Sequence, residues 1–456
     1  VYNAAGTKVF ESSFKGDGVT LIPWGPTTWG GITYAVIGLS IYICYSNRPG
    51  NIPQVLTWDG VSQTSTWTLS TYSETITVGG QKRTPFYRIS PANVTIKPSG
   101  QTGNINLVAS ANIFVAGQIG TRLSWAGRQV TITGVPAGNL ATATVNEQLY
   151  GSEILPFAST PVGVFNIGDV VTGSVSGAKG IVFNVSAGTI TVQVIPPGLT
   201  FLSTDTVVGP GGGIAMSGGA VAGLPGAISL WNDEVMNSYR GYPQSVFTDQ
   251  GRLGFTNFPA VPSAIVWATI GVSSDIWIDP SVATQSPANA IFEIAPGKSQ
   301  VLYVIPGAQS SEIVFCDNAI YFIPITVQNP LVPGGIEFIN ISANGCFPNV
   351  QPRLAEQTIV YMKAGGGQVG AVQAPGAYNR PYIVDNISEF HSHLFTASSP
   401  VAIAIPSASV QFEEQYIYVL FSNGALAVGK YSMKNGLIET GSDGKPNVGW
   451  LPWNGV

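Results

Sequence analysis

The chain has 456 residues, of which 9% are charged, against about 25% in an ordinary globular protein. A hydrophobic share of 45% excludes intrinsic disorder. A net charge of −5 without any run of Lys and Arg excludes a protein that grips nucleic acid through its phosphates.

Glycine and proline indicate the class of secondary structure. The chain has 55 glycines and 32 prolines, a density that long helices do not tolerate and that short strands joined by tight turns use. The sequence therefore predicts an all-β protein of about two to four domains. Only residues 230–239 and 353–363 have a pattern that fits a helical turn or two.

Residues 1–62 are expected to form N-terminal strands and a first blade-like unit. The opening VYNAAGTKVF does not have the pattern of a signal peptide. The most apolar stretch, residues 30–45, is shorter than the roughly 20 residues that cross a bilayer. Its Val, Ile and Tyr content predicts paired strands and no membrane span. Strands at 40–45 and 54–58 would flank the turn SNRPGNIP.

The next two segments have a different pattern. Residues 63–157 are expected to form an inserted β domain, Thr-rich and alternating, with a charged interruption at Gln81-Lys82-Arg83. Residues 158–224 contain the meander FNIGDVVTGSVSGAKGIVFNVSAGTITVQVI and end in a glycine-rich run. Short strands with glycine at most corners predict a small inserted β-barrel, bounded by loops at both ends.

Residues 225–456 repeat one unit, a pair of apolar strands around a tight turn. The pairs are 244–248 with 252–256, 312–316 with 319–323, 358–363 with 368–372, and 415–421 with 425–430. Asn423-Gly424 is a strong hairpin signal because both turn positions need a positive φ. Recurrence about every 50 to 70 residues predicts β-propeller-like blades. Unrelated hairpins in two sandwiches are the alternative.

Few residues offer chemistry. His391 and His393 would share one face of a strand with Glu389, but zinc needs three or four ligands, so we interpret them as structural. There is no G-x-S-x-G elbow, and the glycine runs 211–213 and 365–367 lack a following Lys-Ser/Thr. We expect no metal, no cofactor and no catalytic residue. Cys44, Cys316 and Cys346 are odd in number and widely spaced, which predicts free buried thiols.

Acidic and aromatic residues leave two further readings open. A glycosidase needs two carboxylates around one bond, and five acids are close in sequence: Asp233, Glu234, Asp249, Asp275 and Asp279. We interpret most of them as exposed strand-end and turn acids. A carbohydrate platform would use exposed tryptophans, but we expect Trp267, Trp277, Trp450 and Trp453 to pack in the core or at subunit interfaces.

The segment 231–278 reads WNDEVMNSYRGYPQSVFTDQGRLGFTNFPAVPSAIVWATIGVSSDIWI. It resembles the tail nozzle (tail tubular B-like) family of short-tailed bacteriophages, in which Arg-Gly-Tyr/Trp-Pro precedes a strand and a Gly-Arg-Leu hairpin, a proline, a strand and Gly-x-x-x-Asp follow. The matching positions, to which the resemblance gives a structural role, are Arg240, Gly241, Tyr242, Pro243, Gly251, Arg252, Leu253, Pro262, Gly271 and Asp275.

Other stretches agree with this family in order. IYICYSNRPGNIPQVLTWDG looks like its early strand, turn and second strand, without the histidine often found in that turn. ISEFHSHLF resembles its Asp-x-Ser-x-His-Leu-Phe-like element, which would give His393 a structural role. Residues 165–194 look like its small inserted barrels. The family's N-terminal platform region and further C-terminal strands are not seen here, so we expect either a fragment with an incomplete set of blades or a nozzle of shortened design.

The resemblance implies a structural virion protein without enzymatic activity. Six copies would form a ring below the portal and adaptor, double-stranded genome DNA would pass through its channel without specific binding, and fibres or spikes would attach outside. Low charge fits such a subunit, because uncharged polar surface is buried against copies of itself at little desolvation cost. The alternatives are a carbohydrate-binding propeller, a tail fibre or hub module, and a propeller glycoside hydrolase.

Overall fold

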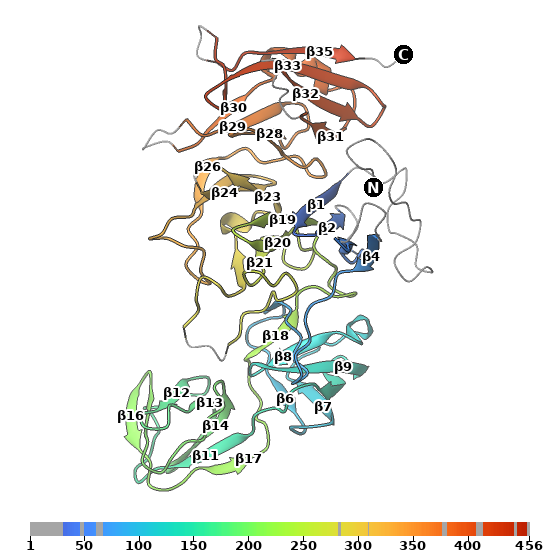
Figure 1. The fold of residues 1–456 in the computed structure, drawn as a ribbon. Helices are drawn as coiled ribbons and strands as arrows, with labels where there is room; N and C mark the ends of the chain where they lie inside the picture. The colour runs from blue at the N-terminus through green and yellow to red at the C-terminus, as the bar shows by residue number, and fades with distance from the viewer. Residues whose placement is uncertain are drawn as a thin grey trace. The chain divides into compact units, whose positions relative to one another are not determined.

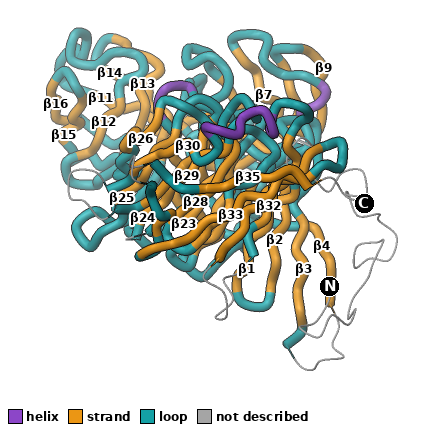
Figure 2. Tube along the Cα trace, turned by 90° about the horizontal axis from the view of Figure 1, so that it is seen from above, coloured by secondary structure: helices purple, strands orange, loops and turns teal. Residues whose placement is uncertain are grey.

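The computed structural model describes residues 31–45, 50–60, 67–280, 284–308, 310–375, 381–406, 414–441 and 445–453. Antiparallel strands dominate the described chain, and helix is confined to three short 3-10 segments, η1 Ala116–Gln118, η2 Pro296–Lys298 and η3 Glu389–Phe395 (Figure 2). The all-β prediction is confirmed. The chain divides into two compact units, a propeller unit within residues 1–73, 241–276 and 286–456, and an inserted unit of residues 74–240 and 277–285.

The propeller unit contains five antiparallel sheets arranged as blades (Figure 1). The first blade is β1 Ile32–Ile37, β2 Ser40–Tyr45, β3 Gln54–Trp58 and β4 Trp67–Thr71. The second is β19 Ser245–Asp249, β20 Arg252–Thr256, β21 Ala264–Trp267 and β22 Ile291–Ile294, and the third is β23 Val301–Gly307, β24 Ser311–Cys316, β25 Ile320–Pro324 and β26 Ile339–Ser342. The fourth is β27 Arg353–Ala355, β28 Thr358–Met362, β29 Val369–Gln373 and β30 Ile383–Asn386. The fifth is β31 Pro400–Ala404, β32 Glu414–Phe421, β33 Leu426–Lys434, β34 Leu437–Ile438 and β35 Val448–Trp453, in which β35 pairs with β33.

Blades pack on one another through strands that are buried on both faces. Every residue of β20, β24, β28 and β29 is buried, and these strands are mainly apolar because neither face meets water. One apolar cluster joins the second blade to the third, another joins the third to the fourth, and another joins the fourth to the fifth. The blades therefore stack in chain order, as the repeated hairpins predicted.

Every predicted hairpin of the propeller unit is present. The strands at 40–45 and 54–58 are β2 and β3, and the later pairs are β19 with β20, β24 with β25, β28 with β29, and β32 with β33. Within residues 30–45, β1 pairs with β2, as predicted. No described helix is long and apolar enough to cross a bilayer.

The two predicted helical turns were wrong. Residues 231–234 form a strand, β18, and residues 353–363 contain β27 and β28. Trp231 pairs with Trp125 across the β18–β8 ladder, and β28 is buried between two strands of its own blade. Tertiary strand pairing outweighs the weak helical pattern in both places.

The inserted unit contains two seven-stranded sheets. The first has the order β5-β18-β8-β9-β10-β7-β6, formed by β5 Phe86–Tyr87, β6 Ile96–Pro98, β7 Asn104–Ala109, β8 Arg122–Trp125, β9 Arg128–Ala137, β10 Leu140–Val145 and β18 Trp231–Glu234. The second has the order β16-β15-β12-β13-β14-β11-β17, formed by β11 Ser152–Pro156, β12 Val170–Gly173, β13 Lys179–Ser186, β14 Thr189–Ile195, β15 Thr206–Gly209, β16 Gly212–Ala215 and β17 Val221–Gly223. A bridge between Phe157 and Met216 joins the ends of β11 and β16 around an apolar core and closes this sheet into the small barrel.

The sheets of the inserted unit do not follow the boundaries 63–157, 158–224 and 225–456. Strand β11 lies before residue 158 but pairs with β14 of the barrel. Strand β18 lies after residue 224 but pairs with β5 and β8 of the first sheet, where the Trp231 indole donates to the Val94 carbonyl at 2.9 Å. Long-range strand pairing decides to which sheet β11 and β18 belong, and local composition does not predict that pairing.

Candidate functional site

The first motif positions form the link that leads into β19. The Arg240 guanidinium Nη2 lies 3.0 Å from the Asp233 Oδ1, and its backbone N–H donates to the Asn237 side chain at 2.7 Å. Gly241 has a φ of +88°, and Pro243 is buried just before the strand begins. These contacts shape the turn that leads into β19.

The later motif positions gather at one end of the second blade. Gly251 and Gly271 both have positive φ values, +73° and +74°, which glycine adopts without steric cost. The Gly271 N–H donates to the Gly251 carbonyl at 3.2 Å, and the Thr269 N–H donates to the Asp275 carbonyl at 2.8 Å. The structure therefore brings Gly251 together with the loop that contains Gly271 and Asp275.

Arg252 is the centre of this cluster. Its side chain is 1% exposed, and Nη1 donates to the carbonyls of Ala268 at 2.7 Å and Asn289 at 2.6 Å. Leu253 is buried beside it and its carbonyl accepts from the Ala268 N–H. Pro262 lies in the loop between β20 and β21, where its carbonyl accepts from the Val301 N–H of the third blade. The motif positions within the second blade are framework residues.

A buried carboxyl pair next to Arg252 was not foreseen. Glu312 of β24 is fully buried and accepts from the Trp267 indole N–H at 3.0 and 3.1 Å. Burial and then the neighbouring Asp249 raise the pKa of Glu312 well above its usual value, and burial also raises the pKa of Asp249. A lone acid in the apolar strand SEIVFC is the signal that sequence reading could have used. The hydrogen bonds from Trp267 of the second blade to Glu312 of the third blade tie these two blades together.

The five acids that the glycosidase reading considered do not form one site. Asp233, Glu234 and Asp279 belong to the inserted unit, whereas Asp249 and Asp275 belong to the propeller unit. Our interpretation of most of these acids as exposed was wrong: Asp233 and Glu234 are 5% and 3% exposed, and the other three are half-buried. Asp233 and Glu234 are paired with cations, which explains why they tolerate burial.

The charged interruption at Gln81-Lys82-Arg83 has a partner within the inserted unit. The Lys82 Nζ lies 2.6 Å from Glu234 and 3.3 Å from Glu74. The Arg122 N–H donates to Glu234 at 2.9 Å, and its Nη1 donates to the Gln129 side chain at 2.8 Å. Burial raises the pKa of Glu234 against the opposing effect of Lys82. Several of the chain's few charged side chains thus pair with one another inside this unit.

The histidine pair does not lie on a strand, so that premise was wrong. His391 and His393 fall within η3, with ring centroids 6.4 Å apart. His393 is exposed, and its carbonyl accepts from the Thr396 hydroxyl at 3.2 Å. Across the described ranges no three His, Cys, Asp or Glu side chains gather as a metal site would need.

Most of the tryptophans and all of the cysteines lie where they were predicted. Trp267, Trp277 and Trp450 are buried in the core, whereas Trp453 is 55% exposed, so for Trp453 only the predicted packing at a subunit interface stays open. The three thiols are free and buried. Burial and then Asp317 raise the pKa of Cys316 to about 12, which makes it a poor nucleophile.

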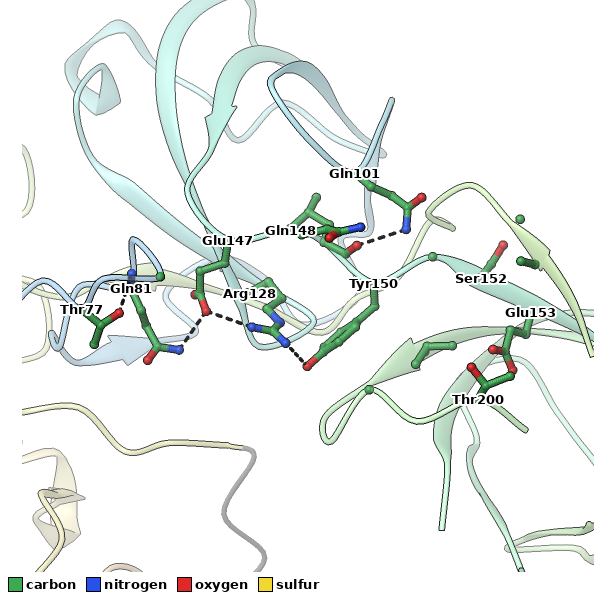
Figure 3. A pocket seen from close by; sticks show the side chains of 17 residues that line it. Thr77, Gln81, Gln101, Arg128, Glu147, Gln148, Tyr150, Ser152, Glu153 and Thr200 are labelled. Atoms are coloured by element: carbon green, nitrogen blue, oxygen red, sulfur yellow. Dashed lines mark hydrogen bonds and ion pairs between the residues drawn. The ribbon is translucent and has the colours of Figure 1, made fainter. Parts of the chain in front are cut away.

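The inserted unit contains a polar cavity of about 570 Å³ that the sequence did not indicate (Figure 3). It lies where the linker between β10 and β11 joins the two sheets of this unit. The side chains that line it include Thr77, Gln81, Gln101, Arg128, Glu147, Gln148, Tyr150, Ser152, Glu153 and Thr200. These residues come from six separate segments of the chain, so no local sequence motif marks them as one site.

The comparisons with known proteins support no functional assignment. The sequence matches no protein-family profile and no curated protein. Among solved structures, a candidate 6-phosphogluconolactonase from Bacteroides uniformis is 10% identical with a TM-score of 0.28, covering 64% of this chain and 82% of its own. A protein from Lactobacillus plantarum is 9% identical with a TM-score of 0.28, covering 66% and 82%. Apo AztD from Citrobacter koseri is 11% identical with a TM-score of 0.24, covering 76% and 80%.

Proposed function

We propose that this chain is a structural subunit of the tail nozzle ring of a short-tailed bacteriophage and performs no catalysis. The proposal rests on the structural role of the residues in the motif between Arg240 and Asp275, which form turns and main-chain hydrogen bonds. Its most buried polar member, Arg252, donates to two main-chain carbonyls inside the second blade. Motif residues that serve the framework of a blade fit a protein whose role is mechanical.

Support for self-assembly comes from the distribution of charge. Only 9% of the residues are charged, and part of that charge is internal, because Asp233, Glu234, Arg252 and Glu312 are each at most 5% exposed. The remaining surface includes large apolar side chains such as Val327, 94% exposed, and Phe390, 72% exposed. A surface of this kind is buried against other subunits with little loss of ion hydration.

The same charge balance fits a channel for DNA. A net charge of −5 without Lys/Arg runs supplies few phosphate contacts, and phosphate contacts provide most of the affinity of non-specific DNA binding. The lumen of such a ring would let a polyanion pass without retaining it. In the virion the ring would lie below the tail adaptor, with fibres or spikes outside.

The proposal is tested by the mass and symmetry of the purified full chain. Native mass spectrometry over a range of protein concentrations, with negative-stain class averages, is expected to give a six-fold ring with a central hole as wide as a DNA duplex. An electrophoretic mobility assay at low salt is expected to show no DNA retardation. A monomer at every concentration would overturn the assembly, and salt-sensitive DNA retention would overturn the channel.

A further inference from the structure

The cavity of the inserted unit has the size of a small-molecule site. Its volume of about 570 Å³ falls within the roughly 300–1,000 Å³ of known ligand pockets. Five segments approach it: the hairpin that holds Gln81, the start of β9, the linker with β11, the loop after β14, and β17. A further segment, the turn between β6 and β7, contributes Gln101.

One wall of the cavity is fixed by a buried carboxylate. Glu147 is 7% exposed, and its Oε1 accepts from the Gln81 amide at 2.9 Å and from the Arg128 Nη1 at 3.1 Å. The Gln129 N–H donates to its Oε2 at 3.2 Å. Arg128 also donates to the Tyr150 hydroxyl at 2.5 Å, and its guanidinium carbon lies 4.4 Å from the ring centroid. Figure 3 shows this row of side chains along the wall, which is held in place before any ligand binds.

Other lining groups keep hydrogen-bonding capacity. The Gln148 side chain is exposed and has no partner within the described ranges. The Gln101 amide nitrogen donates to the Leu149 carbonyl at 3.1 Å, which leaves the Gln101 oxygen as an acceptor. An amide offers both donors and an acceptor, which is what a hydroxyl group needs from its partners.

Small residues keep the cavity open. A Cβ on Gly198 would lie 2.2 Å from the Tyr150 ring, and one on Gly223 would lie 2.7 Å from the Ser152 hydroxyl. Ala222 of β17 is exposed, lines the cavity and stands opposite Glu153 of β11 in the ladder. A large side chain at Ala222 would therefore fill the space.

The charges of the lining disfavour an anionic ligand. Among the described residues that line the cavity, Arg128 is the only cation, and Glu147 already neutralises it. Glu153, 7% exposed, adds a second carboxylate, whose Oε2 accepts from the Phe201 N–H at 3.0 Å. Both carboxylates are held by protein donors, so they suit hydroxyl donors better than they suit a free cation.

We propose that the cavity lined by Gln101, Arg128, Glu147, Gln148 and Tyr150 binds an uncharged saccharide of one or two sugar units. Amides, carboxylates and one aromatic ring around a polar space match a ligand that presents hydroxyl groups in many directions and a modest apolar face. This inference goes beyond the nozzle role and does not need the ring, because every lining residue belongs to the inserted unit of a single chain.

Saturation-transfer difference NMR on the full chain tests the inference. The probes are glucose, galactose, mannose, N-acetylglucosamine, maltose and lactose, and the best of them is then titrated by calorimetry. Removing one neutral hydrogen bond by Gln148→Ala should weaken binding ~2- to ~10-fold. Ala222→Trp should abolish it by filling the cavity. Gln328→Ala, which changes an exposed glutamine of the propeller unit, is the matched control and should bind as the wild type does.

Each outcome decides the matter. Saturable binding of a neutral saccharide that Ala222→Trp removes and Gln328→Ala preserves supports the inference. Absence of signal from all six sugars overturns it, as does binding that neither cavity variant changes. Tighter binding of glucose 6-phosphate or glucosamine than of glucose would overturn the neutral class. A failed ring test would leave these readouts unaffected.

Discussion

The substitution Arg252→Met removes the most buried cation of the second blade while keeping a long apolar side chain. Two carbonyls, those of Ala268 and Asn289, lose donors at 2.7 and 2.6 Å, and hydrogen bonds to charged groups contribute about 1.5–3 kcal/mol each. The contributions are not additive, and Arg252 also faces the buried Glu312. We expect the free energy of unfolding of the propeller unit to fall by about 3–5 kcal/mol.

Urea unfolding followed by far-UV circular dichroism and tryptophan fluorescence measures this loss. Lys434→Met, an exposed position at the end of β33, is the control and should change the free energy of unfolding by at most about 0.5 kcal/mol. Arg353→Met, which loses a single bond of 3.3 Å to the Ile403 carbonyl, should fall between the two. If Arg252→Met unfolds at the same urea concentration as Lys434→Met, the framework role of the Gly-Arg-Leu motif is refuted.

Three further substitutions or treatments test the interior of the propeller unit. Trp267→Phe removes the indole donor to Glu312 and part of a fully buried ring system, so the free energy of unfolding should fall by at least about 1–3 kcal/mol in urea; an unchanged midpoint would contradict this. Because burial and Asp249 raise the folded-state pKa of Glu312, its stabilising contribution is present below the unfolded pKa of about 4.3 and is lost as pH rises through the folded pKa. Glu312→Gln should therefore gain stability relative to the wild type as pH rises from 4 to 8, and parallel melting curves across that range would rule out the raised pKa. A thiol assay with Ellman's reagent should label no cysteine in the native protein and all three in denaturant, because Cys44, Cys316 and Cys346 are buried; rapid native labelling would contradict that placement.

The hairpins of the propeller unit were predictable because their signals are local. Gly424 and Gly251 supply positive φ values that tight turns need, and the strands beside them are short apolar runs. The same local reading identified the barrel, where glycines mark the corners of a meander. Free buried thiols followed from cysteine number and spacing.

The candidate site was not predictable by the same means. Its residues Gln81, Gln101, Arg128 and Gln148 come from loops and strand ends whose composition resembles any polar turn. They meet only because Gln101 binds the linker backbone at Leu149 and the linker joins two separate sheets. Sequence reading treated Gln81-Lys82-Arg83 as an interruption, although Gln81 and Lys82 each bind a buried glutamate.

The all-β class, the repeated hairpins and the low charge of the chain could be predicted from local sequence, since turn chemistry and composition act over a few residues. The tertiary structure was needed to show that β11 joins the barrel and that β18 returns to the first inserted sheet. It also decided that Glu312 meets Trp267 across two blades. The stability of a strand pair depends on which strands meet in space. When the two strands are far apart in the chain, the local sequence of one does not identify the other.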